Sequence, residues 1–368
     1  MRKILKNMDW LILISAVLLV CIGLIALVSA TGDATNYSEL KKQVVWFGVS
    51  LIIMAIVISI DYNTIAKLSV FMYIGTIGLL VAVLFTKPIN GATSWFNFGS
   101  MSFQPAELAK ISIIICLAGV IVKMKEKDKD GIGKLKNLII IGVFLIVPLG
   151  LIIKQPDYGT AMVFVSAIAL ILYVSGIKAR YIGITILVVI IALPLLYYFV
   201  LPLHAQNRIK VFLNPGSQPR GIGYNVIQSK LAIGSGMLTG MGLFKGNQTQ
   251  LGYLYPKTTD FIFSVIGEEL GFIVAGLVII LNIIIVVRSI QISKTSKDTL
   301  GSLIAVGISG IFLFHMTENI GMTMGILPIT GIPLPFVSYG GSSLLTNFIA
   351  IGLLLNISGR RQKSTFAS

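Results

Sequence analysis

Ten long apolar segments, separated by shorter polar stretches, account for most of the chain. Each is close to the ~20 apolar residues that an α-helix needs to cross a bilayer. Since every backbone polar group in lipid must be satisfied internally, segments of this kind span a membrane as helices. The pattern therefore predicts an all-α polytopic membrane protein with about ten transmembrane helices, at residues 11–28, 44–60, 66–86, 105–122, 137–153, 159–176, 181–202, 261–287, 300–325 and 342–357.

The composition supports this class. Apolar residues make up 55% and charged residues 12% of the chain, and the mean hydropathy is +0.92, far from an ordinary soluble domain. Both cysteines, Cys21 and Cys116, fall within apolar segments, so neither a disulfide framework nor a metal site follows from them. The net charge of +15 suits anionic lipid head groups or a phosphate-bearing substrate, and it also suits the usual bias of membrane loops.

The lysines and arginines concentrate in alternate loops. Most lie in loops that share a side with the N-terminus, whereas the short loops of the other side hold only Lys41, Lys42, Lys87 and Lys154. Because cytoplasmic loops carry the excess of these residues, we predict that both termini are cytoplasmic. Residues 203–259 then form a large extracytoplasmic loop between helices 7 and 8.

This topology places the polar motifs at 104–110, 154–160, 253–260 and 333–343 on the outer face. The cytoplasmic segments are short and charged, and they carry no nucleotide-binding motif. We therefore expect a single membrane domain, residues 1–368, whose chemistry is extracytoplasmic and is not driven by ATP.

Three carboxylates lie where the large loop meets helix 8. Asp260 stands at the start of the apolar segment, and Glu268 and Glu269 lie ~12–14 Å further along the helix at ~1.5 Å per residue. Carboxylates in a membrane segment are costly and indicate a functional site. The alternative for Asp260 is a helix cap, since aspartate accepts the free N–H groups of a first helical turn.

Helices 4 and 9 each carry polar side chains on one face. Glu107 and Lys110 are three residues apart and able to pair. The pair either holds helices in register or orients the lysine toward an anionic group in a cavity. His315, Glu318 and Asn319 form a helical stripe, in which a histidine usually makes a hydrogen bond to another helix. The spacing leaves these alternatives open.

The large loop contains an amphipathic pattern at 224–234, which predicts a helix lying on the membrane surface. The glycine-rich run at 234–242 either lets backbone N–H groups approach an anion or forms a flexible turn. A surface helix beside a basic, glycine-rich loop is what a lipid-diphosphate pocket would need.

Five separated motifs run in order along nearly the whole chain. They are FQPAELAK at 103–110, KQPDYGTA at 154–161, NPGSQPRGIGYNVIQSKLAIGSG at 214–236, TDFIFSVIGEELGF at 259–272 and NIGMTMGILPITGIPLPFVSYGGSS at 319–343. Together they resemble the SEDS family (shape, elongation, division and sporulation), whose ten-helix topology also matches. Five ordered blocks are far more specific than one short motif. The chain departs from the family at Lys257, where an acid is common, and at Glu318, where an apolar residue is common.

The resemblance implies a peptidoglycan glycosyltransferase that polymerises lipid II at the outer face of the bacterial cytoplasmic membrane during cell elongation. It also implies a class B penicillin-binding protein as the transpeptidase partner, and no nucleic acid. Asp260 matches the family's essential aspartate and is the candidate catalytic residue. The candidate substrate-binding residues are Glu107, Lys110, Arg208, Gln104, Lys154 and Ser342.

These residues suit the chemistry of such a reaction. Extending a β-1,4 glycan from an α-linked lipid diphosphate inverts the anomeric carbon, so a single displacement needs a base on the acceptor 4-hydroxyl. Asp260 is the predicted base. Lys110, Arg208 or a divalent cation, Mg²⁺ or Mn²⁺, held by Asp260 would neutralise the leaving diphosphate. No other cofactor is expected.

Two alternatives remain. A lipid II transporter or flippase would bind the same lipid without making a bond, but transporters tend to show repeats and broken helices at the bilayer midplane. Here the polar segments cluster at the outer edge, which favours an enzyme. The other alternative is a division-type or sporulation-type paralogue; the sequence GIPLPF at 331–336 and the short termini favour the elongation type.

Overall fold

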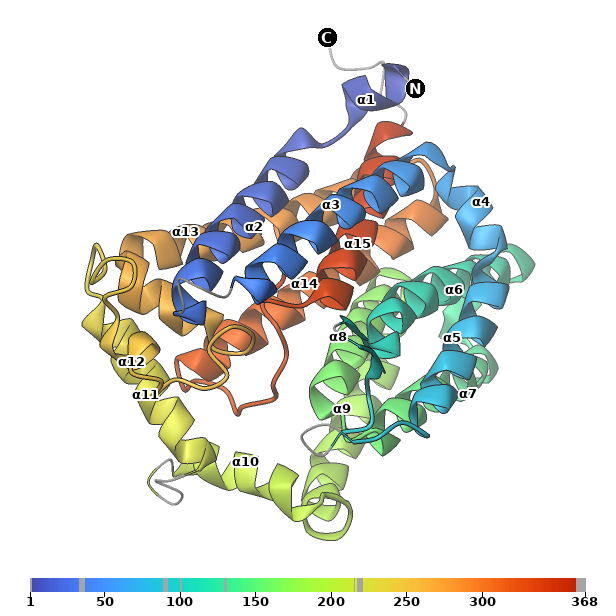
Figure 1. Ribbon diagram of the computed structural model, residues 1–368. Helices are drawn as coiled ribbons and strands as arrows, with labels where there is room; N and C mark the ends of the chain where they lie inside the picture. The colour runs from blue at the N-terminus through green and yellow to red at the C-terminus, as the bar shows by residue number, and fades with distance from the viewer. Residues whose placement is uncertain are drawn as a thin grey trace.

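The computed structural model describes residues 2–32, 37–88, 92–99, 101–128, 131–214, 216 and 221–361. These residues form a helical bundle (Figure 1). Its helices and helical turns are α1 (Arg2–Asn7), α2 (Trp10–Thr31), α3 (Ser38–Ser59), α4 (Tyr62–Lys67), α5 (Ser69–Val83), α6 (Pro105–Lys127), η1 (Gly131–Gly133), α7 (Leu135–Lys154), α8 (Tyr158–Val174), α9 (Ala179–Leu195), η2 (Leu196–Val200), α10 (Leu203–Leu213), α11 (Ile222–Ser235), α12 (Asn247–Gln250), α13 (Ile262–Thr295), α14 (Thr299–Thr323) and α15 (Gly341–Gly359). The sheet in these residues is a small antiparallel ribbon of β1 (Phe96–Phe98) and β2 (Met101–Phe103).

All ten predicted apolar segments are helices, and the all-α class of a polytopic membrane protein is confirmed. Seven of the described helices, α2, α3, α6, α7, α13, α14 and α15, are long and apolar enough to cross a membrane. The other three, α5, α8 and α9, are shorter apolar helices. Near the two ends of the chain, α1 packs against α15 at the same end of the bundle (Figure 1), which agrees with an even number of spans.

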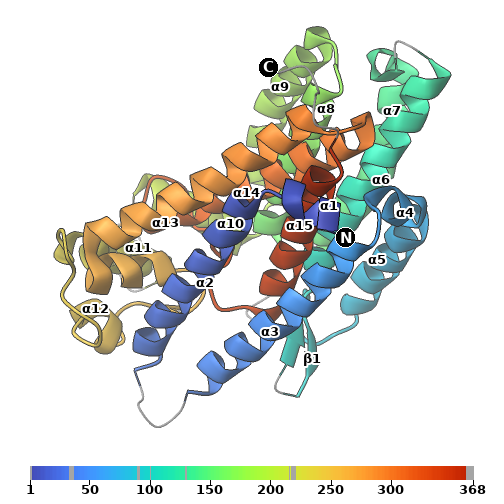
Figure 2. The ribbon, with the colours of Figure 1, turned by 90° about the horizontal axis from the view of Figure 1, so that it is seen from above.

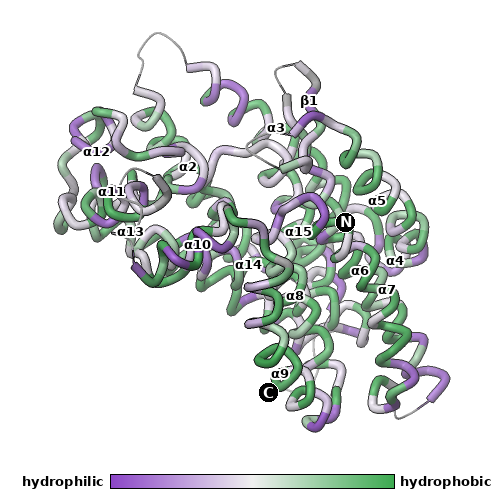
Figure 3. Tube along the Cα trace, turned by 90° about the horizontal axis from the view of Figure 1, so that it is seen from below, coloured by the Kyte–Doolittle hydropathy of each residue, from purple (hydrophilic) through white to green (hydrophobic). Residues whose placement is uncertain are grey.

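The long helices pack side by side, several of them with partners distant in sequence. α13 lies against α14 and α2, α15 against α3, and α14 against α8 and α6. Figure 2 shows α13 and α14 as long rods through the molecule, with α11 and α12 gathered at one end of α13. In Figure 3 the hydrophobic positions follow the long helices, and hydrophilic positions concentrate at helix ends and in the connecting loops.

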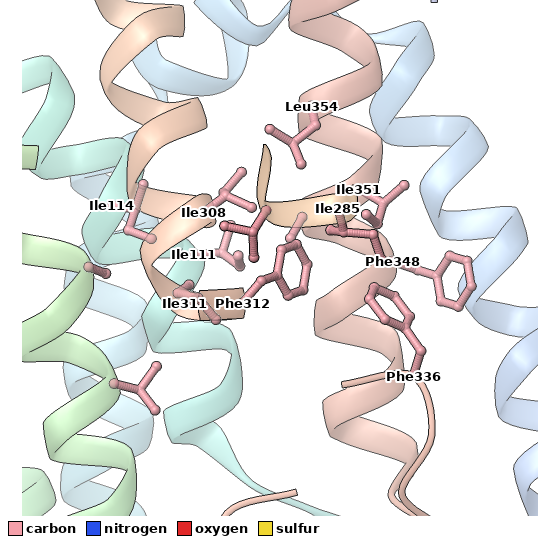
Figure 4. Close-up of a cluster of buried hydrophobic side chains, with 14 of the residues drawn as sticks. Ile111, Ile114, Ile285, Ile308, Ile311, Phe312, Phe336, Phe348, Ile351 and Leu354 are labelled. Carbon is pink, nitrogen blue, oxygen red and sulfur yellow. The ribbon is translucent and has the colours of Figure 1, made fainter. Parts of the chain in front are cut away.

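The core is filled by branched aliphatic and aromatic side chains where α6, α13, α14 and α15 meet (Figure 4). Phe336, from the segment between α14 and α15, places its ring 5.5 Å from the rings of both Phe312 and Phe348. Close packing of this kind fixes side chains in single positions. It anchors the non-helical segment 324–340 inside the bundle, where that segment contributes to the candidate site.

α13 is interrupted at Gly271 (φ 78°, ψ −179°), a break that the sequence pattern did not predict. The glycine-rich run after α11 lies against this break, and the N–H groups of Met241 and Gly242 donate to the carbonyl oxygens of Glu268 and Glu269 at 2.9 and 3.0 Å. Because these N–H groups are used within the protein, this part of the run packs against α13 rather than binding an anion. The helix predicted at 224–234 is confirmed as α11, and its position on the membrane surface stays a prediction.

Candidate active site

Asp260 lies at the end of the loop that leads into α13. The N-cap residue of α13 is Phe261, and that helix start has no side-chain cap. The capping alternative for Asp260 is therefore wrong. Its carboxylate is partly buried, and Asn319 Nδ2 of α14 donates to its backbone oxygen at 3.0 Å. The hydrogen bond from Asn319 fixes the backbone of Asp260, and the Asp260 carboxylate accepts no hydrogen bond from the first turn of α13.

Arg208 of α10 and Asp260 meet at the turn formed by residues 329–331. Arg208 Nη1 donates to the carbonyl oxygens of Ile329 at 3.2 Å and Thr330 at 2.9 Å. Gly331 (φ 77°) comes so close that a Cβ atom there would lie 3.4 Å from Asp260 Oδ2. The fold therefore brings together a carboxylate and a guanidinium that the sequence separates widely.

The pKa of Asp260 is raised above the ordinary aspartate value, mainly because burial penalises the charged carboxylate. A hydrogen bond from Thr259 and the positive charge of Arg208 act in the opposite direction. A carboxylate whose pKa moves toward neutrality is a better general base, provided that it stays ionised at the working pH. Arg208 helps to keep it ionised.

Glu107 and Lys110 form a buried ion pair in α6, with Lys110 Nζ 2.9 Å from Glu107 Oε1. Lys110 Nζ also lies 2.9 Å from His315 Nε2 of α14. His315 Nδ1 lies 3.0 Å from the carbonyl oxygen of Pro333, which can only accept, so Nδ1 carries the proton and Nε2 accepts from Lys110. The sequence paired Glu107 with Lys110 correctly but did not identify His315 as the third member.

The polar stripe on α14 joins this buried pair to the Asp260 loop. Asn319, one turn after His315, donates from Nδ2 to the carbonyl oxygens of Asp260 at 3.0 Å and Ile332 at 2.8 Å. His315 contacts Pro333 in the same segment. One helix face therefore fixes α6, the 329–333 turn and the candidate base relative to one another. The helical spacing of His315 and Asn319 was the available signal for this arrangement.

Gln104 and Asp157 form a second polar contact at this end of the bundle. Gln104 Nε2 donates to Asp157 Oδ2 at 2.7 Å, and the backbone N–H of Thr160 donates to Asp157 Oδ1 at 3.1 Å, capping α8. Burial raises the pKa of Asp157, while the Thr160 hydrogen bonds and the Lys110 charge lower it and the Glu107 charge raises it. Since both its oxygens accept hydrogen bonds, Asp157 is less available as a base than Asp260.

Lys154 and Ser342 lie apart from this group. Lys154 is the exposed last residue of α7. Ser342 is buried in the first turn of α15. Just before this helix, Gln43 of α3 bonds the backbone of Ser338 and Gly340. In the described part of the chain, the hydrogen bonds around Asp260, Arg208 and Lys110 include neither residue.

A metal ion held by protein groups alone does not fit the site. The described residues contain no group of three or more His, Cys, Asp or Glu side chains placed to hold a metal. Magnesium is often bound by one or two carboxylates together with substrate phosphates, and Asp260 would be the protein ligand in that case. Arg208 already supplies a positive charge beside this carboxylate.

The fold and the site define a polytopic helical membrane protein with a partly buried aspartate, an arginine and a buried lysine near one end of the bundle. The chain matches the FtsW/RodA/SpoVE family, described as "Cell cycle protein", over residues 9–363, and it belongs to that family. This is the SEDS family that the five motifs resemble.

Curated relatives and solved structures agree with this assignment. The Escherichia coli K12 protein named "Peptidoglycan glycosyltransferase MrdB" is 35% identical over 339 residues, 92% of this chain and 90% of that protein. A Trichlorobacter lovleyi protein named "Probable peptidoglycan glycosyltransferase FtsW" is 36% identical, over 96% of this chain and 94% of that protein.

Two solved structures cover nearly the whole chain. Thermus thermophilus "Rod shape determining protein RodA" matches with a TM-score of 0.71 and 28% identity, over 97% of this chain and 98% of that one. A chain from a structure described as "Structural coordination of polymerization and crosslinking by a peptidoglycan synthase complex" matches with a TM-score of 0.80 and 26% identity, over 95% and 97% of the two chains.

Proposed function

We propose that this protein is an inverting peptidoglycan glycosyltransferase that polymerises lipid II during cell elongation. Relatives that carry the name peptidoglycan glycosyltransferase align with more than 90% of this chain, which supports the reaction class. The observation that carries the mechanism is the uncapped, partly buried carboxylate of Asp260 beside Arg208.

In the proposed reaction, Asp260 accepts the proton of the acceptor 4-hydroxyl as that oxygen attacks the donor anomeric carbon. A new β-1,4 C–O bond forms, and the bond from the anomeric carbon to the diphosphate oxygen breaks. The electron pair leaves with the diphosphate. Arg208 stabilises the charge that develops there, and Lys110, held by Glu107 and His315, adds a second cation deeper in the bundle. A divalent cation, if bound by Asp260 and the phosphates, would supply the same neutralisation.

The remaining candidate substrate-binding residues take peripheral positions. Gln104 contacts Asp157 close to the Glu107–Lys110 pair, which suits a role in positioning the polar groups around that pair. Lys154 is exposed and would meet substrate only at the surface of the protein. Ser342 is buried at the start of α15 and would bind substrate only if the substrate extends to that helix.

The proposed setting is the bacterial cytoplasmic membrane, with both termini inside and the Asp260 end of the bundle outside. The chain would be one membrane domain, residues 1–368, with 203–259 as its large outer loop. We infer a class B penicillin-binding protein as the partner, because a structural relative belongs to a complex that combines polymerisation and crosslinking. Lys245→Cys in the outer loop and Lys127→Cys at the end of α6 test the orientation.

In a background with Cys21→Ser and Cys116→Ser, an impermeant thiol reagent should label Lys245→Cys in intact cells and should not label Lys127→Cys. The reverse pattern would place the proposed site on the cytoplasmic side and would contradict a reaction at the outer face of the membrane.

The decisive experiment is incubation of the purified protein with labelled lipid II, with and without the partner, followed by separation of glycan products by size. Polymer is expected, and none should appear with an Asp260→Asn preparation purified in parallel, which controls for contaminating polymerases. A flippase would instead move labelled lipid II across vesicle membranes and make no polymer. That result would replace the enzyme with the transporter.

A further inference from the structure

The molecule contains an apolar cavity of about 390 Å³ between α11 and α13, beside the break at Gly271. Its lining is made of apolar side chains and glycines, including Ile233, Met237, Phe272 and Met324. Met237 and Phe272 are 76% and 70% exposed, so the cavity opens to the surroundings. The volume lies within the ~300–1,000 Å³ typical of ligand pockets. An opening lined in this way suits a hydrocarbon chain.

A second cavity, of only about 20 Å³, lies further along α11 and is lined by two cations, Arg208 and Lys230, together with Val226 and Gly325. It marks where the two cations converge; a diphosphate would lie at its mouth, on the exposed side of Lys230. Lys230 lies one helical turn before Ile233 on α11, so the two cavities follow the same helix. The Lys230 side chain crosses Gly325 (φ 71°), and a Cβ atom at Gly325 would lie 3.0 Å from Lys230 Cδ. Glycine at this position therefore lets the lysine lie along the 325–329 segment toward Arg208.

The segment from Met324 to Gly331 arranges four features in order. Met324 lines the apolar cavity, and Gly325 lies under Lys230. The carbonyl oxygens of Ile329 and Thr330 then hold Arg208. Gly331, the last residue of the segment, lies close to Asp260 Oδ2. The order is apolar cavity, two cations and candidate base, which is the order of hydrocarbon chain, phosphates and sugar in a lipid-linked glycosyl donor.

α11 is fixed at the position this arrangement needs. Ser229, next to Lys230, lies 2.6 Å from Ser264 Oγ of α13 and donates to the carbonyl oxygen of Thr323 at 2.7 Å. Ser229 is fully buried, so these bonds tie α11 to both neighbouring helices. The side chain of Lys230 is therefore presented from a helix with a fixed register, and the apolar cavity keeps its walls.

We propose that the polyprenyl chain of the lipid-linked substrate lies in the cavity between α11 and α13, and that Lys230 positions its diphosphate beside Arg208. The proposal rests on the proposed function and adds a tail site and a positioning residue to it. Two adjacent cations next to an apolar cavity match a polyprenyl diphosphate better than a phospholipid, since a diphosphate carries more charge than a phosphodiester. The segment 324–331 also runs from the cavity to the candidate base, an arrangement that a bulk membrane lipid does not require.

The test measures binding of undecaprenyl diphosphate, which lacks sugar and cannot be polymerised, to the purified full-length protein by native mass spectrometry. Gly276→Phe should place a ring in the apolar cavity, because Gly276 lines it and a Cβ atom there meets open space. Gly142→Phe on α7, where a Cβ atom also meets open space, is the matched control. We expect Gly276→Phe to weaken binding ~10-fold or more and Gly142→Phe to leave it unchanged.

Lys230→Met should weaken binding of the same probe by ~10–100-fold, as expected for a lost hydrogen bond to a charged group, and Lys230→Arg should restore much of it. In polymerisation assays, Lys230→Met should raise KM more than it lowers kcat, because Lys230 binds the diphosphate without touching the acceptor. Equal binding by Gly276→Phe and Gly142→Phe, or by Lys230→Met and the unsubstituted protein, would overturn the proposal.

Phosphatidylglycerol serves as the competing arm. If it displaces undecaprenyl diphosphate at equal concentration, the cavity holds ordinary membrane lipid and the assignment is wrong. The outcome is separable from that of the proposed function, because the probe is never a substrate. If the unsubstituted protein binds the probe but makes no polymer, the proposed glycosyltransferase activity is contradicted and the tail site is not.

Discussion

Asp260 and Glu268 belong to one short stretch of sequence, and the structure gives them opposite environments. Glu268 is fully buried and accepts hydrogen bonds from Gln248 N at 2.7 Å, Thr249 N at 3.0 Å and Thr249 Oγ1 at 2.6 Å, which caps the short helix α12. Asp260 is partly buried, caps no helix and lies within the electrostatic influence of Arg208. A carboxylate whose acceptor sites are filled stabilises structure, whereas one with free acceptor capacity is available for chemistry.

Glu269 belongs with Glu268. It accepts from Gln250 Nε2 at 2.8 Å and from Gly246 N at 3.3 Å, so both glutamates hold the loop that carries α12. Lys257, which departs from the family pattern, donates to the carbonyl oxygen of Thr249 at 2.9 Å in the same loop. Glu268 and Glu269, the acids that lie deepest in the apolar segment, therefore stabilise a loop. Asp260 is left as the candidate base of this stretch.

The largest effect is expected from Asp260→Asn. An amide cannot accept the proton of the acceptor hydroxyl, so polymerisation should fall by ~10²–10⁴-fold. Stability in detergent should stay unchanged, because the carboxylate caps no helix. The measurement pairs a lipid II polymerisation assay with denaturant unfolding. Asp260→Glu should also lose roughly 10²-fold in rate, since an added methylene displaces the carboxylate by about 1 Å. Wild-type rates in Asp260→Asn would contradict the assignment of the base.

Lys110→Met should lower both stability and activity. It leaves the buried Glu107 carboxylate without its cation and His315 without its donor, and breaking a buried pair in this way costs ~3–5 kcal/mol. Denaturant unfolding in detergent measures the loss. The double variant Glu107→Gln with Lys110→Met should regain much of the stability and none of the activity, because the cation proposed to neutralise the diphosphate is still missing. Recovery of both would make the pair purely structural.

Glu268→Gln is the counterpart of Asp260→Asn. The amide keeps one acceptor oxygen and turns its NH₂ group toward the α12 hydrogen-bond donors, so we expect a loss of ~1–3 kcal/mol in stability. The polymerisation rate per folded molecule should change little. If Glu268→Gln instead removes activity while unfolding normally, the contrast between the two acids fails and Glu268 becomes the candidate base.

The smallest effect concerns pH. Arg208 lowers the pKa of Asp260 against the larger effect of burial, so Arg208→Gln should raise that pKa further. Asp260 works only when ionised, and the acid limb of the kcat/KM profile should therefore move to higher pH. Lys210→Gln, on the same helix and exposed, is the control and should leave the limb in place. An unmoved limb in Arg208→Gln would show that Arg208 does not act on Asp260.

The sequence by itself determined the helical class, the ten apolar segments, the pairing of Glu107 with Lys110 and the family. These follow from local rules: segment length against bilayer thickness, helical spacing, and ordered motifs. The start of α6 at Pro105 follows in the same way, since proline suits the first helical position.

Only the tertiary structure decided which polar groups act together. His315 becomes the partner of Lys110 because α14 packs against α6. The charge of Arg208 acts on Asp260 because Arg208 binds the turn at 329–331 that also contacts Asp260. The tertiary structure also places α12 next to Glu268, so that this carboxylate accepts hydrogen bonds from the loop and stabilises it. The role of a buried charge depends on which donors and charges surround it, and those come from segments that spacing along the chain cannot relate.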